Sequence, residues 1–199
     1  MEIARERFQL TPGRRGGGGP GAGGGWTLAS STRYDRARPV IVLAPLLEVG
    51  PDSLPLTLQY DVVDFSGSLR ILGEAGRGRF TVRFVARALE RAREFPIDDR
   101  TVLLDDSVFA LYVFAAWRGA SAAPGTLTAV LPRALRRETL AVQAQGPGTT
   151  TLDGAASTLH LVTITGGVNR AVHVWLDRAG RLMKVEIPSR RLTAERARE

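Results

Sequence analysis

The sequence predicts a mainly β protein: one antiparallel meander of about ten strands, curled into a half-open barrel around a single buried helix. Strand signals separated by turn residues recur along the chain, and no strand–helix–strand alternation indicates a doubly wound fold. Only one segment, near residues 106–118, is apolar without a strand period. A chain of 199 residues has room for one core, so we expect a single domain over residues 1–199.

The N-terminal region predicts a hairpin with a long loop. Residues 1–10 have the alternation of a first strand, and residues 26–34 predict the second. Between them, residues 13–25 are rich in glycine, which loses much backbone entropy on ordering, so we expect a flexible loop. A phosphate-binding loop is disfavoured, because no Gly-Lys-Ser/Thr motif follows.

The middle of the chain predicts further strands joined by turns. The clearest runs from Leu56 to Val62, where Leu, Leu, Tyr and Val alternate with Thr, Gln and Asp. Pro45 is expected to break or bulge its strand, and Arg87–Glu94 fits either the end of a strand or a helical turn. The predicted strands cover residues 40–49, 56–62, 69–72, 80–88 and 101–104.

The segment near residues 106–118 predicts the principal helix. Good N-cap residues stand at positions 105–107, and from Val108 to Trp117 the Tyr112 hydroxyl is the single polar interruption. Ten helical residues rise about 15 Å, which is too short to cross a bilayer. A helix that is apolar on every side must be buried, so we expect it to cover the concave face of the sheet.

The C-terminal third predicts a return to strands. Residues 190–199 are expected to form a charged tail, helical or frayed. The predicted strands cover residues 127–131, 139–144, 158–165, 170–176 and 181–187.

Arginine dominates the charge of the protein. Lys and Arg number 27 against 20 Asp and Glu, a formal net charge of +7, and Lys184 is the one lysine. The arginines are spread along the chain and no aromatic-rich strand accompanies them, so we expect a solvated surface and no nucleic-acid partner. An anion-binding patch is the alternative.

Composition excludes several kinds of site. The chain has no cysteine, which excludes disulfides, zinc–thiolate sites, thiol nucleophiles and a lipidated cysteine. No run approaches the roughly 18–20 apolar residues of a membrane span, so we expect no transmembrane segment. The sequence near Met1 has no apolar run of about 7–15 residues, so no secretory signal is visible there.

The two histidines predict a cross-strand pair. If Gly166 and Gly167 form a two-residue turn, opposed residues have numbers that sum to 333, which places His160 opposite His173 on the outer face of the hairpin. Side chains so placed lie about 5 Å apart at Cβ, close enough to share a metal or a proton. A catalytic zinc usually has three protein ligands and no third is indicated, so surface pairing is favoured over metal binding or acid–base chemistry.

Other candidate chemistry has simpler interpretations. Asp98, Asp99, Asp105 and Asp106 crowd together in sequence, but the EF-hand spacing is absent. A position at the start of the predicted helix is a sufficient explanation for Asp105 and Asp106, because the free N–H groups there favour anions. Neither Gly-x-Ser-x-Gly nor a dinucleotide fingerprint occurs. We therefore expect no catalytic residue, no cofactor and no enzymatic activity.

Several motifs together resemble those of bacterial envelope half-barrel proteins. They are Glu6-Arg7-Phe8 before the second strand, the run from Val102 to Phe109 into the helix, and the late hairpin from Val174 to Pro188. The group includes periplasmic lipoprotein carriers and related domains of unknown function. The resemblance implies an incomplete barrel that wraps around helices and leaves an apolar concave pocket, with no catalytic residues. It also implies the periplasm or cell envelope, while the lack of a visible signal peptide keeps the cytoplasm open.

The leading functional hypothesis is a non-enzymatic protein of the cell envelope that holds a lipid or another apolar ligand in the half-barrel. A closed core that the same residues fill is the structural alternative. Alternation and helix position indicate the pocket lining as Leu58, Tyr60, Phe80, Phe84, Phe109, Tyr112, Val113 and Trp117.

Two other functional classes stay open. One is a protein-interaction module that uses the sheet edge or the arginine-rich surface. The other, less favoured, is a metal-dependent hydrolase centred on His160 and His173. A cavity beneath the helix would favour a ligand pocket, whereas a filled interior with an exposed apolar patch would favour the interaction module.

Overall fold

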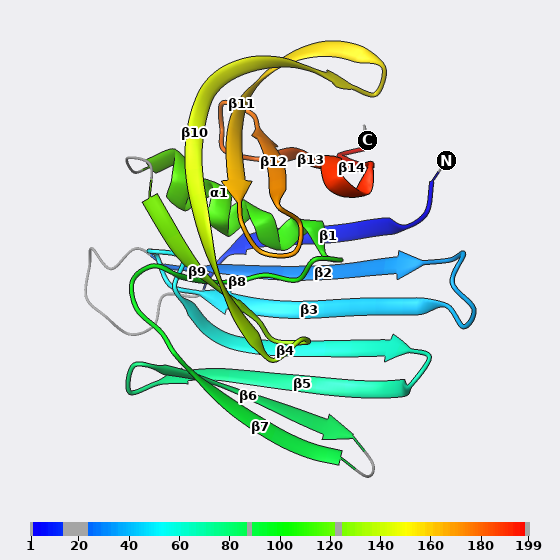
Figure 1. The fold of residues 1–199 in the computed structure, drawn as a ribbon, viewed down its shortest axis with the longest axis vertical. Helices are drawn as coiled ribbons and strands as arrows, with labels where there is room; N and C mark the ends of the chain where they lie inside the picture. The colour runs from blue at the N-terminus through cyan, green and yellow to red at the C-terminus, as the bar shows by residue number, and fades with distance from the viewer. Residues whose placement is uncertain (1, 14–23, 87–88, 122–124, 198–199) are drawn as a thin grey trace. The chain divides into compact units, whose positions relative to one another are not determined.

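The computed structural model describes residues 2–13, 24–86, 89–121 and 125–197 (Figure 1). They form fourteen strands in two seven-stranded sheets, one α-helix and two short 3₁₀ helices. The mainly β prediction is confirmed, whereas the expected single meander of about ten strands is wrong, because the strands divide into two sheets. By internal contacts the chain splits into two compact units, Met1–Ala110 with Val130–Arg137 and Leu111–Ala129 with Glu138–Glu199.

The first unit contains the first sheet, a curled half-barrel in which strands adjacent in sequence are adjacent in the sheet (Figure 1). All neighbouring pairs are antiparallel. Of the segment Arg87–Glu94, for which the sequence fits either a strand end or a helical turn, residues 89–94 belong to β7, and residues 87 and 88 lie outside the described residues. The strands are β1 (Arg5–Pro12), β2 (Trp26–Tyr34), β3 (Ile41–Val49), β4 (Pro55–Asp64), β5 (Gly67–Gly76), β6 (Arg79–Ala86) and β7 (Leu89–Pro96).

Alternation in the sequence gives the first sheet two different faces. In β4, Leu58 and Tyr60 are buried whereas Thr57 and Gln59 are exposed, and β6 alternates in the same way from Phe80 onward. Successive side chains of a strand point to opposite sides of the sheet. One face, the inner face, therefore holds the core, and the other, the outer face, is exposed.

Pro45 lies inside β3 without ending it, so the expected break is wrong. Pairing with β4 continues through Pro45, which faces Tyr60. On the other side, the β2–β3 ladder skips Ala44 and Pro45. Proline has no backbone N–H, so it interrupts one ladder while the strand continues through the other.

A strip of chain after β7 lies against the inner face of the first sheet. It begins with β8 (Thr101–Leu103), which contacts β4, and leads to the 3₁₀ helix η1 (Phe109–Leu111). The Leu104 N–H donates to the Val130 carbonyl at 3.0 Å. The strip is almost entirely buried, which explains its apolar sequence.

The second sheet has the order β14-β13-β12-β11-β10-β9-β8. Within the second unit, α1 (Tyr112–Ser121) packs on β11 and β12. A Cβ at Gly119 would collide with Val142, so glycine permits this close approach. The helix predicted near 106–118 is therefore present, but its α-helical part begins later. The further strands are β9 (Gly125–Leu131), β10 (Arg136–Leu152), β11 (Ala155–Thr165), β12 (Ala171–Leu176), β13 (Leu182–Ile187) and β14 (Leu192–Glu195).

The ends of β10 and β11 form a curved arm, residues 146–161 (Figure 1). Its two strands pair after a register shift between Ala144 and Gly146. The arm turns back onto β13, because the Lys184 ammonium donates to Thr150 Oγ1 at 3.1 Å and to the Thr151 carbonyl at 2.8 Å.

Two expectations about flexible segments have different outcomes. The charged tail expected at 190–199 is wrong for Leu192–Glu195, which pairs with β13 as β14. The chain turns into that strand after the 3₁₀ helix η2 (Pro188–Arg190), with Arg191 at a left-handed φ of 50°. The glycine-rich loop expected at 13–25 lies, for residues 14–23, outside the described residues.

Candidate functional site

Four of the residues proposed to line a pocket share the inner face of the first sheet. Tyr60 of β4 and Phe84 of β6 oppose the same residue, Ile71 of β5. Leu58 and Phe80 lie further along the same two strands on the same face. None of the four is more than 9% exposed, so protein atoms of the chain already cover them.

The Phe80 ring shows how the inner face is filled. A Cβ at Gly73 of β5 would lie 2.5 Å from two atoms of that ring and 3.0 Å from Leu58 Cβ. The aromatic ring therefore occupies the space that a side chain at position 73 would need. Packing of this density is typical of a protein core.

A buried carboxylate anchors the strip over the inner face. Asp105 is 3% exposed, and its two oxygens accept bonds from Arg133 Nε at 2.8 Å and Nη2 at 2.9 Å. Tyr60 Oη donates to Asp105 at 3.0 Å, and the Ser107 N–H donates at 2.9 Å. Burial beside this carboxylate raises the pKa of Tyr60, and hydrogen bonds to Asp105 raise the pKa of Arg133. The cluster is fully paired, which suits an anchor better than a reacting group.

Glu6 of β1 caps the start of the helical segment from a distant part of the chain. Its carboxylate accepts the N–H of Phe109 at 2.8 Å, the N–H of Ala110 at 3.2 Å and the Ser30 hydroxyl at 2.6 Å. Burial raises the pKa of Glu6, and these hydrogen bonds oppose the rise. Asp105 accepts the Ser107 N–H, as expected near the helix start, but Glu6 accepts the N–H groups of the 3₁₀ helix itself, and the main partner of Asp105 is Arg133, 28 positions later.

The eight proposed lining residues fall into both units. Phe109 belongs to the first unit and is buried, whereas Tyr112, Val113 and Trp117 belong to the second. In the second unit, Trp117 Nε1 donates to the Gly180 carbonyl at 2.7 Å, and Asn169 Nδ2 donates to Tyr112 Oη at 3.0 Å. These bonds tie α1 to the loops at the two ends of β12.

The histidines do not form the expected pair. β11 and β12 are joined by five residues, 166–170, instead of two, and the Gly166 N–H closes this loop on the Arg170 carbonyl at 2.8 Å. The register therefore shifts by three: His160 opposes Leu176, and His173 opposes Thr163. A shift by an odd number moves one side chain to the other face, so the two imidazoles lie on opposite faces of the hairpin.

Lys184 is the centre of a buried polar cluster in the second unit that sequence reasoning missed. It is 5% exposed, and its Nζ lies 3.0 Å from Glu186 Oε1 and 3.2 Å from Glu195 Oε1. Burial lowers the pKa of Lys184, but the two carboxylates raise it by more. A signal existed in the sequence, since one lysine among 27 cations marks a position where the compact ammonium suits better than a guanidinium.

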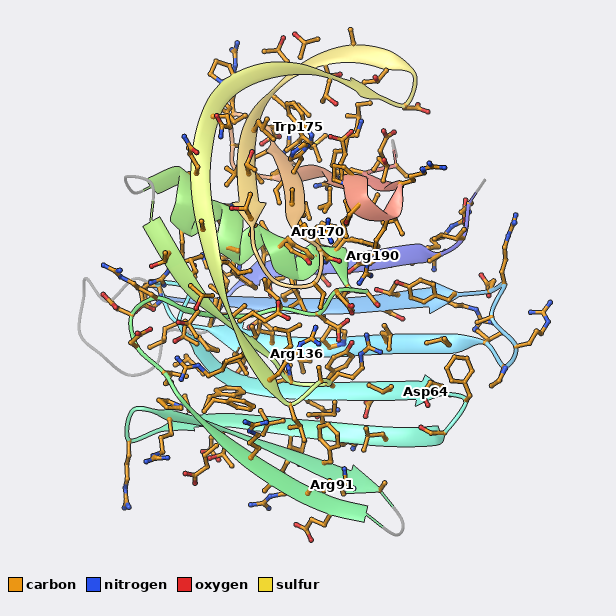
Figure 2. All side chains as sticks on the ribbon, in the orientation of Figure 1. Asp64, Arg91, Arg136, Arg170, Trp175 and Arg190 are labelled. Carbon is orange, nitrogen blue, oxygen red and sulfur yellow. The ribbon has the colours of Figure 1, made fainter. Side chains whose placement is uncertain are left out.

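The surroundings of Lys184 are aromatic and enclosed. Trp175 lies within the curve of the arm (Figure 2), where a Cβ at Gly148 would touch its ring at 3.3 Å. Trp175 Nε1 donates to Glu186 Oε2 at 2.9 Å, and His173 Nδ1 lies 3.8 Å from the same oxygen. Burial raises the pKa of Glu186, and the bonds from Trp175 and Lys184 lower it by more, so the net shift is downward.

The remaining carboxylates hold local structure. Asp98 accepts the Arg100 N–H and the Thr101 hydroxyl, both at 3.0 Å, and so closes the turn before β8. Among the described residues, no group of three or more His, Asp or Glu side chains is placed to hold a metal ion. Within the same residues, no helix is long and apolar enough to cross a membrane.

The outer face of the first sheet carries an apolar patch. Leu46, Val63, Leu72 and Val85 of strands β3 to β6 are between 39% and 44% exposed, and we call these four residues the outer patch. Leu46 and Leu72 flank Gln59 in one row across the sheet. The outer patch lies on the face opposite the residues that were expected to bind a ligand.

An exposed aromatic ring stands at one end of this face. Phe65 is 71% exposed at the turn between β4 and β5. The preceding Asp64, at the end of β4 (Figure 2), accepts the Ser66 N–H at 2.8 Å and the Ser66 hydroxyl at 2.6 Å. These bonds fix the turn, so the ring is presented on an ordered backbone.

Comparisons with protein-family models, with curated proteins and with solved structures found no match. The resemblance to envelope half-barrel proteins is therefore confirmed only at the level of architecture, as a curled half-barrel sheet.

Proposed function

We propose that this protein is a non-enzymatic interaction protein that binds a protein partner through the outer face of its half-barrel sheet. The single observation that carries the proposal is the outer patch: four branched apolar side chains exposed on neighbouring strands of one face. Surface hydrophobic residues are ordinary when scattered singly, but a group on one face indicates an interaction surface.

The contrast with the inner face supports this choice over a ligand pocket. Phe80 and Tyr60 are at most 1% exposed, so the inner face already has its protein neighbours. Phe65 adds an ordered aromatic anchor at the edge of the outer face, the kind of residue that dominates binding energy at interfaces.

The polar clusters favour a structural role over catalysis. Asp105 holds four hydrogen bonds from three residues, and Lys184 is surrounded by acceptors. A general base or a nucleophilic amine needs a free lone pair directed at a substrate. Both clusters are saturated from within the chain, which supports the non-enzymatic part of the proposal.

Photo-crosslinking tests the proposal. A benzophenone amino acid replaces Leu72 in the full chain, which is expressed in its own host and irradiated. We expect a discrete protein adduct from position 72. The matched control is position 168, where Val168 is 47% exposed in the second unit, and we expect no adduct there. Equal labelling at both positions, or none at 72, would overturn the proposal.

A second candidate function is binding of a lipid or another apolar ligand on the inner face. It rests on the apolar inner face that crosses β2 to β6, and it requires a ligand to displace part of the chain, because that face is already covered. The residues concerned are Leu28, Leu47, Leu58, Ile71 and Val82, all buried. Native mass spectrometry of protein purified from its host tests it, because a bound lipid would appear as a discrete added mass. Periplasmic extraction of the same cells tests the envelope location that belongs to this candidate.

A further inference from the structure

We propose that the free edge of β7 binds an extended peptide segment of a partner protein, which adds to the first sheet as a further antiparallel strand. The segment has an acidic, an apolar and an acidic residue at three consecutive positions. This edge is separate from the outer patch on β3 to β6, so the inference goes beyond the proposed function and has its own test.

β7 is the last strand of the first sheet and is exposed on both faces (Figure 1). In β4 and β6 buried and exposed residues alternate, but the five residues from Glu90 to Glu94 are all exposed. Among the edge strands of the described residues, β8 is entirely buried, β14 has four residues, and β1 carries Glu6, which caps η1. β7 is therefore the edge that another chain reaches most easily.

The register shows which backbone groups of β7 point away from the sheet. One step beyond the pair Arg79–Pro96, the Ile97 N–H donates to the Gly78 carbonyl at 2.9 Å, which makes these two residues a hydrogen-bonded pair. Bonded and non-bonded pairs alternate along an antiparallel ladder. The odd-numbered residues 91–95 therefore bond to β6, whereas the even-numbered residues 90–94 direct their N–H and C=O groups to the open edge.

Glu90, Ala92 and Glu94 thus offer an incoming strand three donors and three acceptors. Pro96, two positions further on, has no N–H, so the set of donors ends before it. Backbone bonds of this kind supply affinity when a peptide is added to a sheet edge, and the side chains beside them supply specificity.

The inner side of the edge selects acidic residues. Arg91, which Figure 2 labels on β7, and Arg93 oppose Phe84 and Val82 of the inner face. Arg93 donates to the Leu135 carbonyl and lies 5.2 Å from the centre of the Phe95 ring, so its position is fixed. Neither arginine has a carboxylate partner among the described residues. Acidic residues opposite the two would supply those partners.

The outer side of the edge selects an apolar residue between the two acidic ones. Glu90 Oε1 lies 4.0 Å from Arg83 Nε, and Glu94 Oε2 lies 3.2 Å from Arg79 Nη1, so both carboxylates already face a cation of β6. Ala92 stands between them, and its short side chain leaves room for a branched residue on the facing strand. Because side chains alternate between faces, the three consecutive residues read acidic, apolar, acidic.

The same charges exclude a second copy of the chain from this edge. Two β7 strands paired antiparallel about a two-fold axis keep residues of one face together, so with Ala92 at the centre Glu90 meets Glu94 and Arg91 meets Arg93. Like charges directly opposite each other are destabilising. The edge is protected against self-association, as natural edges often are, and stays open to a strand of the opposite pattern.

Fluorescence anisotropy with a labelled peptide measures the binding. The probe is Ser-Thr-Glu-Val-Glu-Thr-Ser with a fluorescein label, added to the full chain at low ionic strength. The control peptide Ser-Glu-Glu-Val-Thr-Thr-Ser has the same composition and charge, but its two carboxylates fall on opposite faces of a strand. We expect the probe to bind about tenfold more tightly than the control. Equal affinities would overturn the inference, because attraction to the net charge of +7 would then explain both.

N-methylated probes distinguish strand addition from attraction between charges alone. In the added strand the valine N–H faces Ala92 and donates to its carbonyl, whereas the N–H groups of the two glutamates point away from β7. N-methylation of the valine should abolish binding. N-methylation of the first glutamate should change the affinity less than about threefold, since it removes no bond to the edge. Equal losses for the two peptides would refute strand addition.

Ala92→Pro tests the backbone of the edge from the protein side. The change removes an N–H that points away from β6, and proline is tolerated at such positions of edge strands. We expect probe binding to be lost while the circular dichroism spectrum of the sheet stays unchanged.

Charge reversal locates the site on β7. The double variant Arg91→Glu/Arg93→Glu should weaken probe binding about tenfold or more, and the control Arg36→Glu/Arg178→Glu, which changes the net charge equally at exposed positions, should not. The reversed peptide Ser-Thr-Lys-Val-Lys-Thr-Ser should bind the first double variant, which a fault in folding would prevent. Failure of this rescue, or a wild type that does not bind the probe, would overturn the inference. Crosslinking from position 72 tests the proposed function separately, whichever result the edge gives.

Discussion

Among the described residues, both units of the protein hold a buried ion-pair cluster, and the two clusters are built differently. In the first unit, Asp105 is enclosed and binds one guanidinium, Arg133, through two hydrogen bonds. In the second, Lys184 is enclosed, but its carboxylate partners Glu186 and Glu195 have side chains 26% and 33% exposed. The buried member is thus an anion in one cluster and a cation in the other.

The difference determines how each cluster responds to damage. Removing Asp105 would leave the buried Tyr60 hydroxyl without its acceptor, and an unpaired buried polar group is costly. Arg133, whose side chain is 32% exposed, would keep only the contact with Asp106 at 3.2 Å and the Ser107 hydroxyl. Removing Lys184 would leave two carboxylates that water already reaches. The first cluster should therefore be less tolerant of substitution than the second, because it also contains a buried hydroxyl that depends on the removed group.

The largest effect is expected for Asp105→Ala. Loss of this acceptor should lower the free energy of unfolding by about 2–4 kcal/mol, because the buried Tyr60 hydroxyl loses its acceptor and Arg133 loses its two closest hydrogen bonds. Urea denaturation followed by circular dichroism measures the change. Asp106→Ala is the matched control, since that carboxylate is 27% exposed and also lies 3.2 Å from Arg133. Equal losses for the two variants would contradict the anchor role of Asp105.

A smaller effect, which depends on pH, is expected for Glu6→Gln. Burial raises the pKa of Glu6 in the folded state, so the stability linked to its protonation is complete below the ordinary value of 4.5 and is lost as the pH rises through the folded pKa. Relative to the wild type, the neutral variant should gain stability over that range, by about 1.4 kcal/mol for each unit of pKa shift. Urea titrations from pH 4 to pH 8 measure it. Ser30→Ala, which removes a donor to Glu6, should enlarge the effect, and a parallel course for all three proteins would refute it.

Lys184→Met should cost about 1–2 kcal/mol at neutral pH, less than Asp105→Ala, because Glu186 and Glu195 can rehydrate. The pKa of Glu186 is lowered in the folded state, so its contribution is present above the ordinary value of 4.5 and is lost as the pH falls through the folded pKa. Lys184→Met should therefore lose less stability than the wild type as the pH falls. Lys184→Arg, which keeps the positive charge, should lose as much as the wild type. A cost as large as that of Asp105→Ala would remove the distinction between the clusters.

The smallest effects are expected for the histidines. His173→Ala and His160→Ala should each change the free energy of unfolding by less than about 1 kcal/mol, because both side chains are at least partly exposed. Zinc should bind neither site tightly, since the imidazoles lie on opposite faces. NMR titration with and without zinc tests this, and sub-micromolar zinc binding would contradict the observed register.

Local pattern was a good guide to elements and a poor one to their partners. The alternation around Leu58 and Tyr60 identified β4 and its buried face, and the apolar run from Val108 identified the buried helical segment. The histidine register failed because glycine was assigned to a two-residue turn, whereas the chain closes a five-residue loop with Arg170 at a φ of 58°. The length of a turn depends on which strand positions can be buried together, so the local sequence of the turn does not predict it.

The sequence by itself determined the β class, the two-faced strands and the need to bury residues 108–116, because side-chain period and polarity act within a few residues. Only the tertiary structure decided that Glu6 caps a helical segment 103 positions away, that Asp105 pairs with Arg133, and that Lys184 joins the arm to β13. It also decided which charges share a row of the outer face. Such pairings follow from strand register and chain reversal, which bring distant residues together and leave no mark at either position alone.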